Sequence, residues 1–193
     1  MFLTDFKNQA QIFFRSLEDD LKSNRIEFEA HWDIDHVCYR TPSQERYLEL
    51  KEKLTQTAAL LIESEVNGRV ISTFRLHEPF EFRGCRIDLL ELPAPKPGVQ
   101  TDEGFEHIEI VCDKSFSELE SRFSNFNIDK KGLKKNFNRE LEIKLGKRNI
   151  KFHHLSLLSV IRLEANRKVW SALQSSQILS LFADYEPLVV GTF

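Results

Sequence analysis

One order of secondary-structure elements occurs on both sides of a proline-rich segment, and this repeat constrains the fold most. Residues 93–104 (PAPKPGVQTDEG) hold three prolines and two glycines, so they predict a linker without regular structure. Before the linker, residues 34–40 (IDHVCYR) predict a strand and residues 43–57 a helix. Residues 60–92 then predict three strands, because the turn dipeptides NG and RG interrupt a β-rich run.

The same order returns after the linker. Residues 105–113 (FEHIEIVCD) predict a strand and residues 115–126 a helix. Residues 138–146 and 148–156 predict two further strands around a Gly146-Lys147 turn. The chain therefore consists of two halves with one plan.

The opening strands of the two halves also share a short motif. Asp35-His36-Val37 aligns with Glu106-His107-Ile108 at an offset of 71 residues, which places an acid, a histidine and a β-branched residue at the same point of each half. This is a weak internal repeat, and it favours a duplicated module.

A helix is expected at each end of the duplicated part. Residues 4–23 place apolar side chains at three- and four-residue spacings, which is typical of an amphipathic helix. A second long helical stretch begins near residue 156, and we expect it to pack on a sheet. It precedes the tail YEPLVVGTF, residues 185–193.

Composition and charge exclude several classes of function. The 193 residues are 41% apolar, which is enough for a core, and 27 Lys and Arg stand against 30 Asp and Glu. Because the basic residues are scattered, we expect no nucleic-acid partner. No apolar run approaches the ~18 residues that a membrane span needs.

The N-terminus and the cysteines indicate a cytoplasmic protein. The first fifteen residues carry Asp5 and Lys7 among the apolar positions and lack a small-residue cleavage site, unlike a signal peptide. Cys38, Cys85 and Cys112 are odd in number and contain no CxxC motif, so we expect reduced thiols.

Histidines on the predicted strands suggest a metal site. Strict alternation places His36 on one face with Ile34, Cys38 and Arg40. By the same rule His107 shares a face with Phe105, Glu109 and Val111. If the two halves form one concave sheet, imidazoles and carboxylates converge there, and such ligands suit Zn²⁺, Ni²⁺, Mn²⁺ or Fe²⁺.

Each of these residues also has a plainer interpretation. A single histidine on a strand is more often packed or exposed than a ligand, and we expect this for His31 and His154. Cys38 fits a small buried residue better than a soft ligand. Glu106 is expected to face the helices or solvent. Arg40 and Arg69 lie either at a solvated sheet edge or beside a substrate anion.

Five segments carry a family resemblance: IDHVCYR, NGRVISTFRLHEP, LLELPAPKPG, GFEHIEIV and IKFHHLSL. They resemble the YecM family, which belongs to the vicinal oxygen chelate superfamily with glyoxalase, extradiol dioxygenases and methylmalonyl-CoA epimerase. The resemblance runs from about residue 32 to 163. It implies an α+β fold in which paired βαβββ modules form a cupped mixed sheet around a metal, with additional N- and C-terminal helices.

On this basis residues 1–193 are expected to form a single domain. Its parts are an N-terminal helical extension at 1–30, a first βαβββ module at 31–98, a second at 104–160, and a C-terminal helix and tail at 161–193.

The resemblance also implies a site. Its metal ligands correspond to His36, Glu91, His107 and His153, although glyoxalase-like members usually supply a glutamate where this chain has His153. His77 and Glu109 are further candidates, as ligands or as partners of ligands. Arg40 and Arg69 would orient the substrate, and Glu109 or Glu91 would act as the base.

These expectations lead to competing functions. The first is a divalent-metal-dependent isomerase, lyase or dioxygenase-like enzyme that acts on a small oxygen-rich substrate. The second is a module on the same fold that binds or sequesters a small ligand without turnover. A third is an interaction scaffold built on the terminal helices. In each case the chain is expected to be a monomer or a homodimer.

Overall fold

The computed structural model describes residues 2–66, 68–135 and 137–170. The chain divides into two compact units, Met1–Ser156 and Leu157–Phe193, which are described separately. In the second unit, helix α4 (Leu157–Trp170) confirms that a helix begins near residue 156. The tail at 185–193 lies outside the described residues.

The first module follows the order that the sequence predicts. Its elements are β1 (Asp33–Arg40), α2 (Gln44–Thr55), β2 (Ala58–Val66), β3 (Arg69–Phe82) and β4 (Cys85–Pro93). Helix α2 begins where it does because the Ser43 side chain accepts a hydrogen bond from the backbone N–H of Arg46, which is an N-cap.

The second module has the same plan with two differences from expectation. Its elements are β5 (Gly104–Val111), α3 (Phe116–Arg122), β6 (Asn127–Asp129), the 3-10 helix η1 (Lys131–Lys134), β7 (Leu141–Leu145) and β8 (Arg148–His153). Helix α3 starts at a capping box between Ser115 and Glu118 and ends earlier than residue 126. The residue pattern did not indicate strand β6, because three residues are too few to show alternation, although the βαβββ plan implied by the resemblance includes it.

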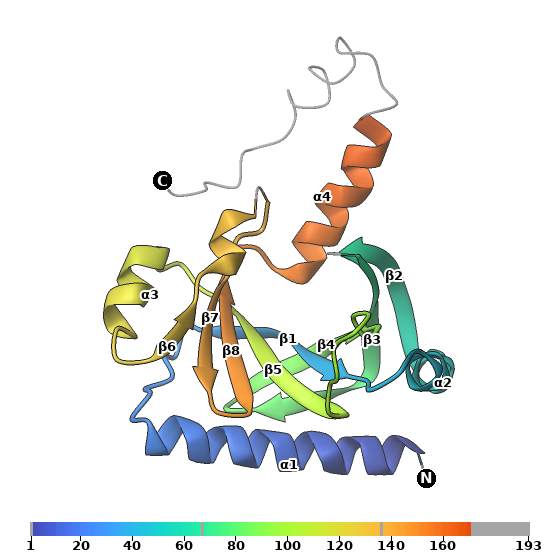
Figure 1. Ribbon diagram of the computed structural model, residues 1–193, viewed down its shortest axis with the longest axis horizontal. Coiled ribbons are helices and arrows are strands. Elements are labelled where there is room, and N and C mark those ends of the chain that lie inside the picture. Colours follow the sequence, from blue (N-terminus) through green and yellow to red (C-terminus); the bar gives the residue numbers. More distant parts are fainter. Residues whose placement is uncertain (1, 67, 136, 171–193) are drawn as a thin grey trace. The chain divides into compact units, whose positions relative to one another are not determined.

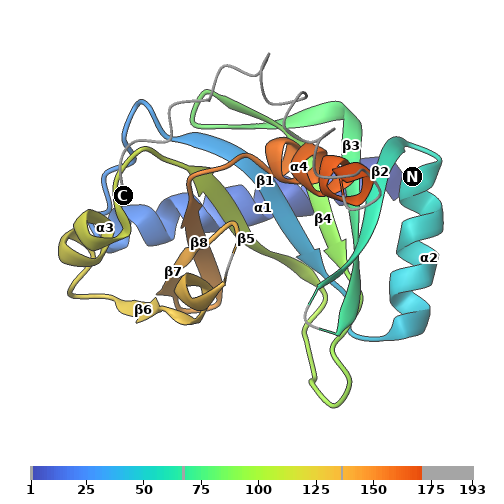
Figure 2. The same ribbon diagram turned by 90° about the horizontal axis from the view of Figure 1, so that it is seen from above.

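The sheet shows the duplication directly. Its eight strands within the described residues run in the order β2-β3-β4-β1-β5-β8-β7-β6. Strands β1 and β5 pair antiparallel at the centre, and each pairs in parallel with the last strand of its own module, β1 with β4 and β5 with β8. The sheet is open and strongly curved (Figures 1 and 2). This arrangement confirms the paired βαβββ modules.

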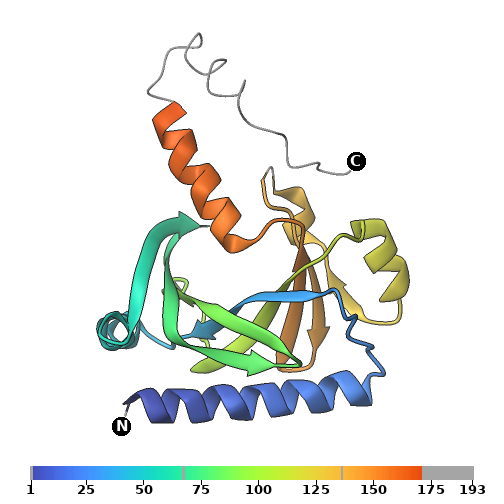
Figure 3. The ribbon, with the colours of Figure 1, turned by 180° about the vertical axis from the view of Figure 1, so that it is seen from behind.

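Helix α1 (Phe2–Ser23) lies along one side of the sheet (Figures 1 and 3). Its buried residues are Phe6, Ala10, Phe13, Phe14, Leu17 and Leu21. The Phe6 ring lies 5.1 Å from that of Phe105, and the Phe14 ring stacks on Phe82 at 5.0 Å. This packing covers one face of β5 and β3 with apolar side chains.

The described helices contain no stretch that combines the length and the hydropathy needed to cross a bilayer.

Candidate metal centre

Two β-bulges interrupt the pairing of the central strands. The register between β1 and β5 shifts between Ile34 and His36, and again between Cys38 and Tyr39. The first shift makes Asp35 an extra residue on β1, and the second makes Glu106 an extra residue on β5. A bulge re-aims side chains that strict alternation would send to opposite faces.

The bulges correct the predicted faces. Ile34 pairs with Ile110, so it lies on the face opposite to His36 and Glu109, which pair with each other. Phe105 packs on the Phe6 and Phe13 rings of α1, away from the face of His107. The prediction that these apolar residues share a face with the two histidines is therefore wrong, because alternation breaks at the residue between them.

Each bulge brings an acid onto the histidine that follows it. Asp35 Oδ2 lies 2.8 Å from His36 Nδ1, and Glu106 Oε2 lies 2.9 Å from His107 Nδ1. We call these the first and the second acid–histidine pair. Glu106 is partly exposed beside α1, as predicted, but its contact with His107 was not predicted. Sequence reasoning also missed Asp35, although the repeat of an acid before each histidine was the signal for both.

The first pair points at a convergence of carboxylates and imidazoles. Glu109 Oε2 lies 3.5 Å from His36 Nε2 and 3.8 Å from His153 Nε2. Glu91 Oε2 lies 3.8 Å from His36 Nε2. Both Nε2 atoms are buried and have no hydrogen-bond partner among the described residues. Two unsatisfied imidazole nitrogens thus face one carboxylate oxygen, an arrangement that needs a physical explanation.

The other ring nitrogens hold these two histidines in place. His153 Nδ1 bonds to the carbonyl of Leu155, and His36 Nδ1 bonds to Asp35. Metal-binding histidines are commonly held through their second nitrogen by a carbonyl or carboxylate. Burial lowers the pKa of His153, which favours the neutral ring that a metal requires.

His36 behaves differently because carboxylates surround it. Burial lowers its pKa, but Glu109, Asp35 and Glu91 outweigh burial and raise the pKa well above its usual value. His36 therefore carries a proton in the metal-free protein, and a cation that bound at Nε2 would replace that proton.

Glu109 is the centre of the cluster. Its Oε1 lies 3.2 Å from His107 Nε2 and 3.0 Å from Lys151 Nζ, while Oε2 faces His36 and His153. Burial raises the pKa of Glu109, but the charges of Lys151 and His36 lower it by more. The pKa of Glu109 therefore lies well below the usual value. Glu109 is ionised, and its partners fix its orientation.

The second pair is closed, in the sense that its histidine has no ring nitrogen left for a metal. Both ring nitrogens of His107 face carboxylates, Nδ1 that of Glu106 and Nε2 that of Glu109. Burial and Lys151 lower the pKa of His107, but Cys38 and Glu106 outweigh them and raise it to about 10. The described residues contain three groups of close donor atoms: His36 with Glu91 and Glu109, His36 with Asp35 and His153, and, separately, His107 with Cys38 and Glu106.

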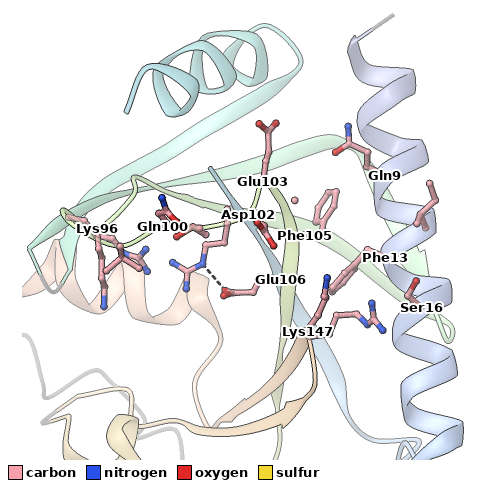
Figure 4. Close-up of a pocket in the computed structure, with 17 residues that line it drawn as sticks. Gln9, Phe13, Ser16, Lys96, Gln100, Asp102, Glu103, Phe105, Glu106 and Lys147 are labelled. Carbon is pink, nitrogen blue, oxygen red and sulfur yellow. Dashed lines mark hydrogen bonds and ion pairs between the residues drawn. The ribbon is translucent and has the colours of Figure 1, made fainter. Parts of the chain in front are cut away.

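The remaining predicted residues lie away from this convergence. His77 is exposed on β3. Arg40 Nε donates to Glu106 Oε2 at 2.6 Å, and Arg69 donates to the carbonyl of Ala94 at 3.4 Å. Both arginines line a cleft of about 860 Å³ beside α1. The lining of this cleft includes Glu106 but not His36, Glu91, Glu109 or His153 (Figure 4).

A family model described as YecM protein matches residues 3–156. The chain belongs to the YecM family. It is 34% identical to an uncharacterized protein of Haemophilus influenzae over 109 residues, which are 56% of each chain. It is 38% identical to Protein YecM of Escherichia coli over 80 residues, 40% of this chain and 41% of that protein. The matches thus span about half the length of these curated relatives.

Among solved structures, the YecM-family chain is similar to the structural-genomics target Protein EC4020. The TM-score is 0.71 at 26% identity, over 84% of this chain and 92% of that chain. A more distant likeness, with a TM-score of 0.44 and 12% identity, is to methylmalonyl-CoA epimerase of Streptomyces coelicolor, over 63% of this chain and 95% of that one.

The donor set of this YecM-family chain fits a divalent cation. Two imidazole nitrogens and carboxylate oxygens suit several borderline ions. Ligand atoms about 2.1 Å from a tetrahedral ion lie about 3.4 Å from one another. The separations of 3.5–3.8 Å around Glu109 Oε2 and His36 Nε2 are close to that value. The unpartnered Nε2 atoms would then be satisfied by the cation.

Proposed function

We propose that this YecM-family protein holds one divalent metal ion between His36, His153 and Glu109, with Glu91 as the fourth ligand. One observation carries the proposal: the buried Nε2 atoms of His36 and His153 have no hydrogen-bond partner in the described chain and face the same oxygen of Glu109. A divalent cation satisfies both nitrogens at once and balances the carboxylates around them.

In this proposal His107 is not a ligand. Both of its nitrogens already hydrogen-bond to carboxylates, at 2.9 and 3.2 Å, whereas a ligand nitrogen must have no such bond. His107 instead donates to Glu109 Oε1 and orients the Glu109 carboxylate, so that Oε2 points at His36 and His153. Lys151 donates to the same Oε1 and supports that orientation.

The proposed reaction type is that of a metal-dependent isomerase, lyase or dioxygenase with a small oxygen-rich substrate. A bound ion would supply Lewis-acid stabilisation of negative charge on substrate oxygens. Of the two proposed bases, Glu91 is the better one, and it would act as a base only while it is not bound to the ion. Its side chain is 18% exposed against 8% for Glu109, and Glu109 accepts from both His107 and Lys151, which weakens it as a proton acceptor.

A second candidate function is a module that binds a small ligand without turnover. The observation in its favour is the position of the cleft, which is lined by Arg40 and Arg69 and not by the convergent histidines. In that case the buried cluster would be a structural charge network, and the ligand would bind beside it.

Metal content tests the proposal. The chain, stripped with a chelator and then exposed separately to Zn²⁺, Ni²⁺, Mn²⁺ and Fe²⁺, should retain about one ion after desalting, measured by plasma mass spectrometry. His36→Ala and His153→Ala should lose it. His77→Ala is the matched control, because His77 is an exposed strand histidine, and it should retain the ion. Absence of metal from the wild type, or full retention in both site variants, would overturn the proposal.

An open coordination position separates an enzyme-like centre from a structural one. Co²⁺ bound at the site should give a visible spectrum that shifts when oxalate, a bidentate oxygen ligand, is added. A spectrum that does not respond to saturating oxalate would indicate a closed structural site and would favour the non-catalytic module.

A further inference from the structure

Two arginines from different strands meet at the cleft beside the second acid–histidine pair. Arg40 ends β1, and Arg69 begins β3. Both side chains are partly buried, and both line the cleft of about 860 Å³. Glu106 lies between the two ends of this cleft, with Lys96 and Gln100 towards one end and Lys147 and Phe13 towards the other (Figure 4).

The two guanidinium groups differ in their partners. Arg40 is paired with Glu106, whose Oε2 lies 2.6 Å from Arg40 Nε. Arg69 has no carboxylate within ion-pair distance among the described residues, and its Nη1 donates to the Ala94 carbonyl at 3.4 Å. Burial and the charge of Arg40 lower the pKa of Arg69. A partly buried cation is thus held near a like charge without an acid of its own, which costs free energy unless an anion joins it.

The other charged groups of the cleft do not neutralise this pair. Glu103 already binds Arg46, and Arg148 already binds Asp20. Lys96, Lys147 and Asp102 also line the cleft, and none of the three is ion-paired in the described chain. Arg69, Lys96 and Lys147 thus outnumber the one remaining acid, Asp102, and this excess of positive charge favours a ligand with two negative charges over one with a single charge.

We propose that Arg40 and Arg69 bind the phosphate group of a small-molecule ligand in this cleft. A guanidinium offers parallel N–H donors that match the oxygens of a phosphate. Arg69 would donate through its free N–H groups, and Arg40 through those that Glu106 does not occupy. The cleft volume leaves room for the rest of a small phosphate monoester.

The phosphate position is linked to the metal centre through the fold. Arg40 follows His36 by four residues on β1, which is about 13 Å along a strand. A continuous set of contacts also connects them, from Arg40 to Glu106, from Glu106 to His107, and from His107 to Glu109. That the phosphate holds a substrate for chemistry at Glu109 rests on the proposed function, whereas phosphate binding by the two arginines does not.

Calorimetric titration of the full chain with inorganic phosphate at constant ionic strength tests the proposal. Wild-type protein should bind phosphate with and without metal, and acetate at least tenfold more weakly. Arg69→Gln should weaken phosphate binding at least tenfold, and Arg69→Lys should fall between the two because it keeps the charge but not the fork. Arg86→Gln, at an exposed arginine outside the cleft, is the control and should bind as wild type does.

Two results would overturn the proposal: phosphate no tighter than acetate in the wild type, or unchanged phosphate affinity in folded Arg69→Gln. The test uses variants of Arg69 and not of Arg40, because Arg69 has no ion pair in the described chain whose loss would disturb the fold, whereas Arg40 is paired with Glu106. Metal content, measured on the same samples, should be unchanged in Arg69→Gln. A chain that binds phosphate but no metal would overturn only the metal proposal, and one that binds metal but no phosphate would overturn only this one.

Discussion

The two acid–histidine pairs are built alike and yet end in different surroundings. Each is made by a bulge on an opening strand, and each joins a carboxylate to Nδ1 of the next histidine at 2.8–2.9 Å. The Nε2 atom of His36 is unsatisfied, whereas that of His107 lies 3.2 Å from Glu109. Duplication of the local structure therefore did not duplicate the candidate ligand environment.

The register explains this difference. The residue two positions after the histidine is Cys38 in the first module and Glu109 in the second. Because β1 and β5 are antiparallel, each histidine pairs with that residue of the other module: His36 with Glu109, and His107 with Cys38. The carboxylate of the second module thus completes the centre around the histidine of the first.

The neighbouring strands, β4 and β8, place opposite charges beside the two acid–histidine pairs. Cys38 pairs with Glu91 of β4, and Glu109 pairs with Lys151 of β8. The first module therefore adds the acid Glu91 beside His36, whose Nε2 has no hydrogen-bond partner in the described chain. The second module adds the cation Lys151 beside Glu109 and His107. A cation favours the side with excess carboxylates, and Lys151 already provides positive charge on the other side.

The largest expected difference between the two pairs concerns metal content. His36→Ala should abolish metal binding because it removes a ligand. His107→Ala should retain about one ion per chain, with affinity lowered by roughly 10- to 100-fold, since it removes only a group that orients Glu109. Competition with a chromophoric chelator measures both. Complete loss of metal from His107→Ala, with the variant folded, would show that the second histidine is itself a ligand.

Substitution of the acids of the two pairs should also change metal affinity unequally. The difference should be smaller than the one between the two histidines. Asp35→Asn should weaken metal binding by roughly 10- to 100-fold, because Asp35 fixes the ring of a ligand. Glu106→Gln should weaken it by less than about tenfold, because Glu106 acts through His107. The same chelator competition gives both values, and equal losses would contradict the distinction between an open and a closed pair.

Much of this arrangement could be predicted from local sequence patterns. The periodicity of residues 4–23 and the glycine turns after β2 and β3 are local signals, and the elements that depend on them were predicted correctly. The repeated acid and histidine also identified the two central strands. Such signals act over a few residues, so one sequence is enough to detect them.

The parts that failed depend on pairing between distant residues. Strict alternation placed Ile34 beside His36 because no local signal marks Asp35 as a bulge. His77 was a candidate because it lies on a strand, but the register of β3 against β4 shifts between Arg75 and Phe80, and His77 is exposed in that stretch. That His36 opposes Glu109 follows only from the register between the modules.

The smallest expected effect is on the pH dependence of the free energy of unfolding. It can be measured on metal-free protein, and it concerns the second pair alone. Burial raises the pKa of Glu106, but His107 and Arg40 outweigh it and lower the pKa to about 2. A carboxyl group with a lowered pKa stabilises the fold above its unfolded pKa near 4.5, and this contribution is lost as the pH falls towards the folded value. Urea unfolding of metal-free protein should therefore show Glu106→Gln less stable than wild type at pH 7, on the order of 2 kcal/mol, with the gap closing between pH 5 and pH 2.

Glu49 provides the matched control for this titration. Its pKa is also lowered to about 2, through Lys53 and Arg46, but it is exposed on α2. Solvent screens such pairs, so Glu49→Gln should leave the pH dependence of unfolding close to that of wild type. A gap between wild type and Glu106→Gln that stays constant from pH 7 to pH 2 would mean that Glu106 contributes by packing and not by charge. The second pair would then not be held by the ion pairs that distinguish it from the first.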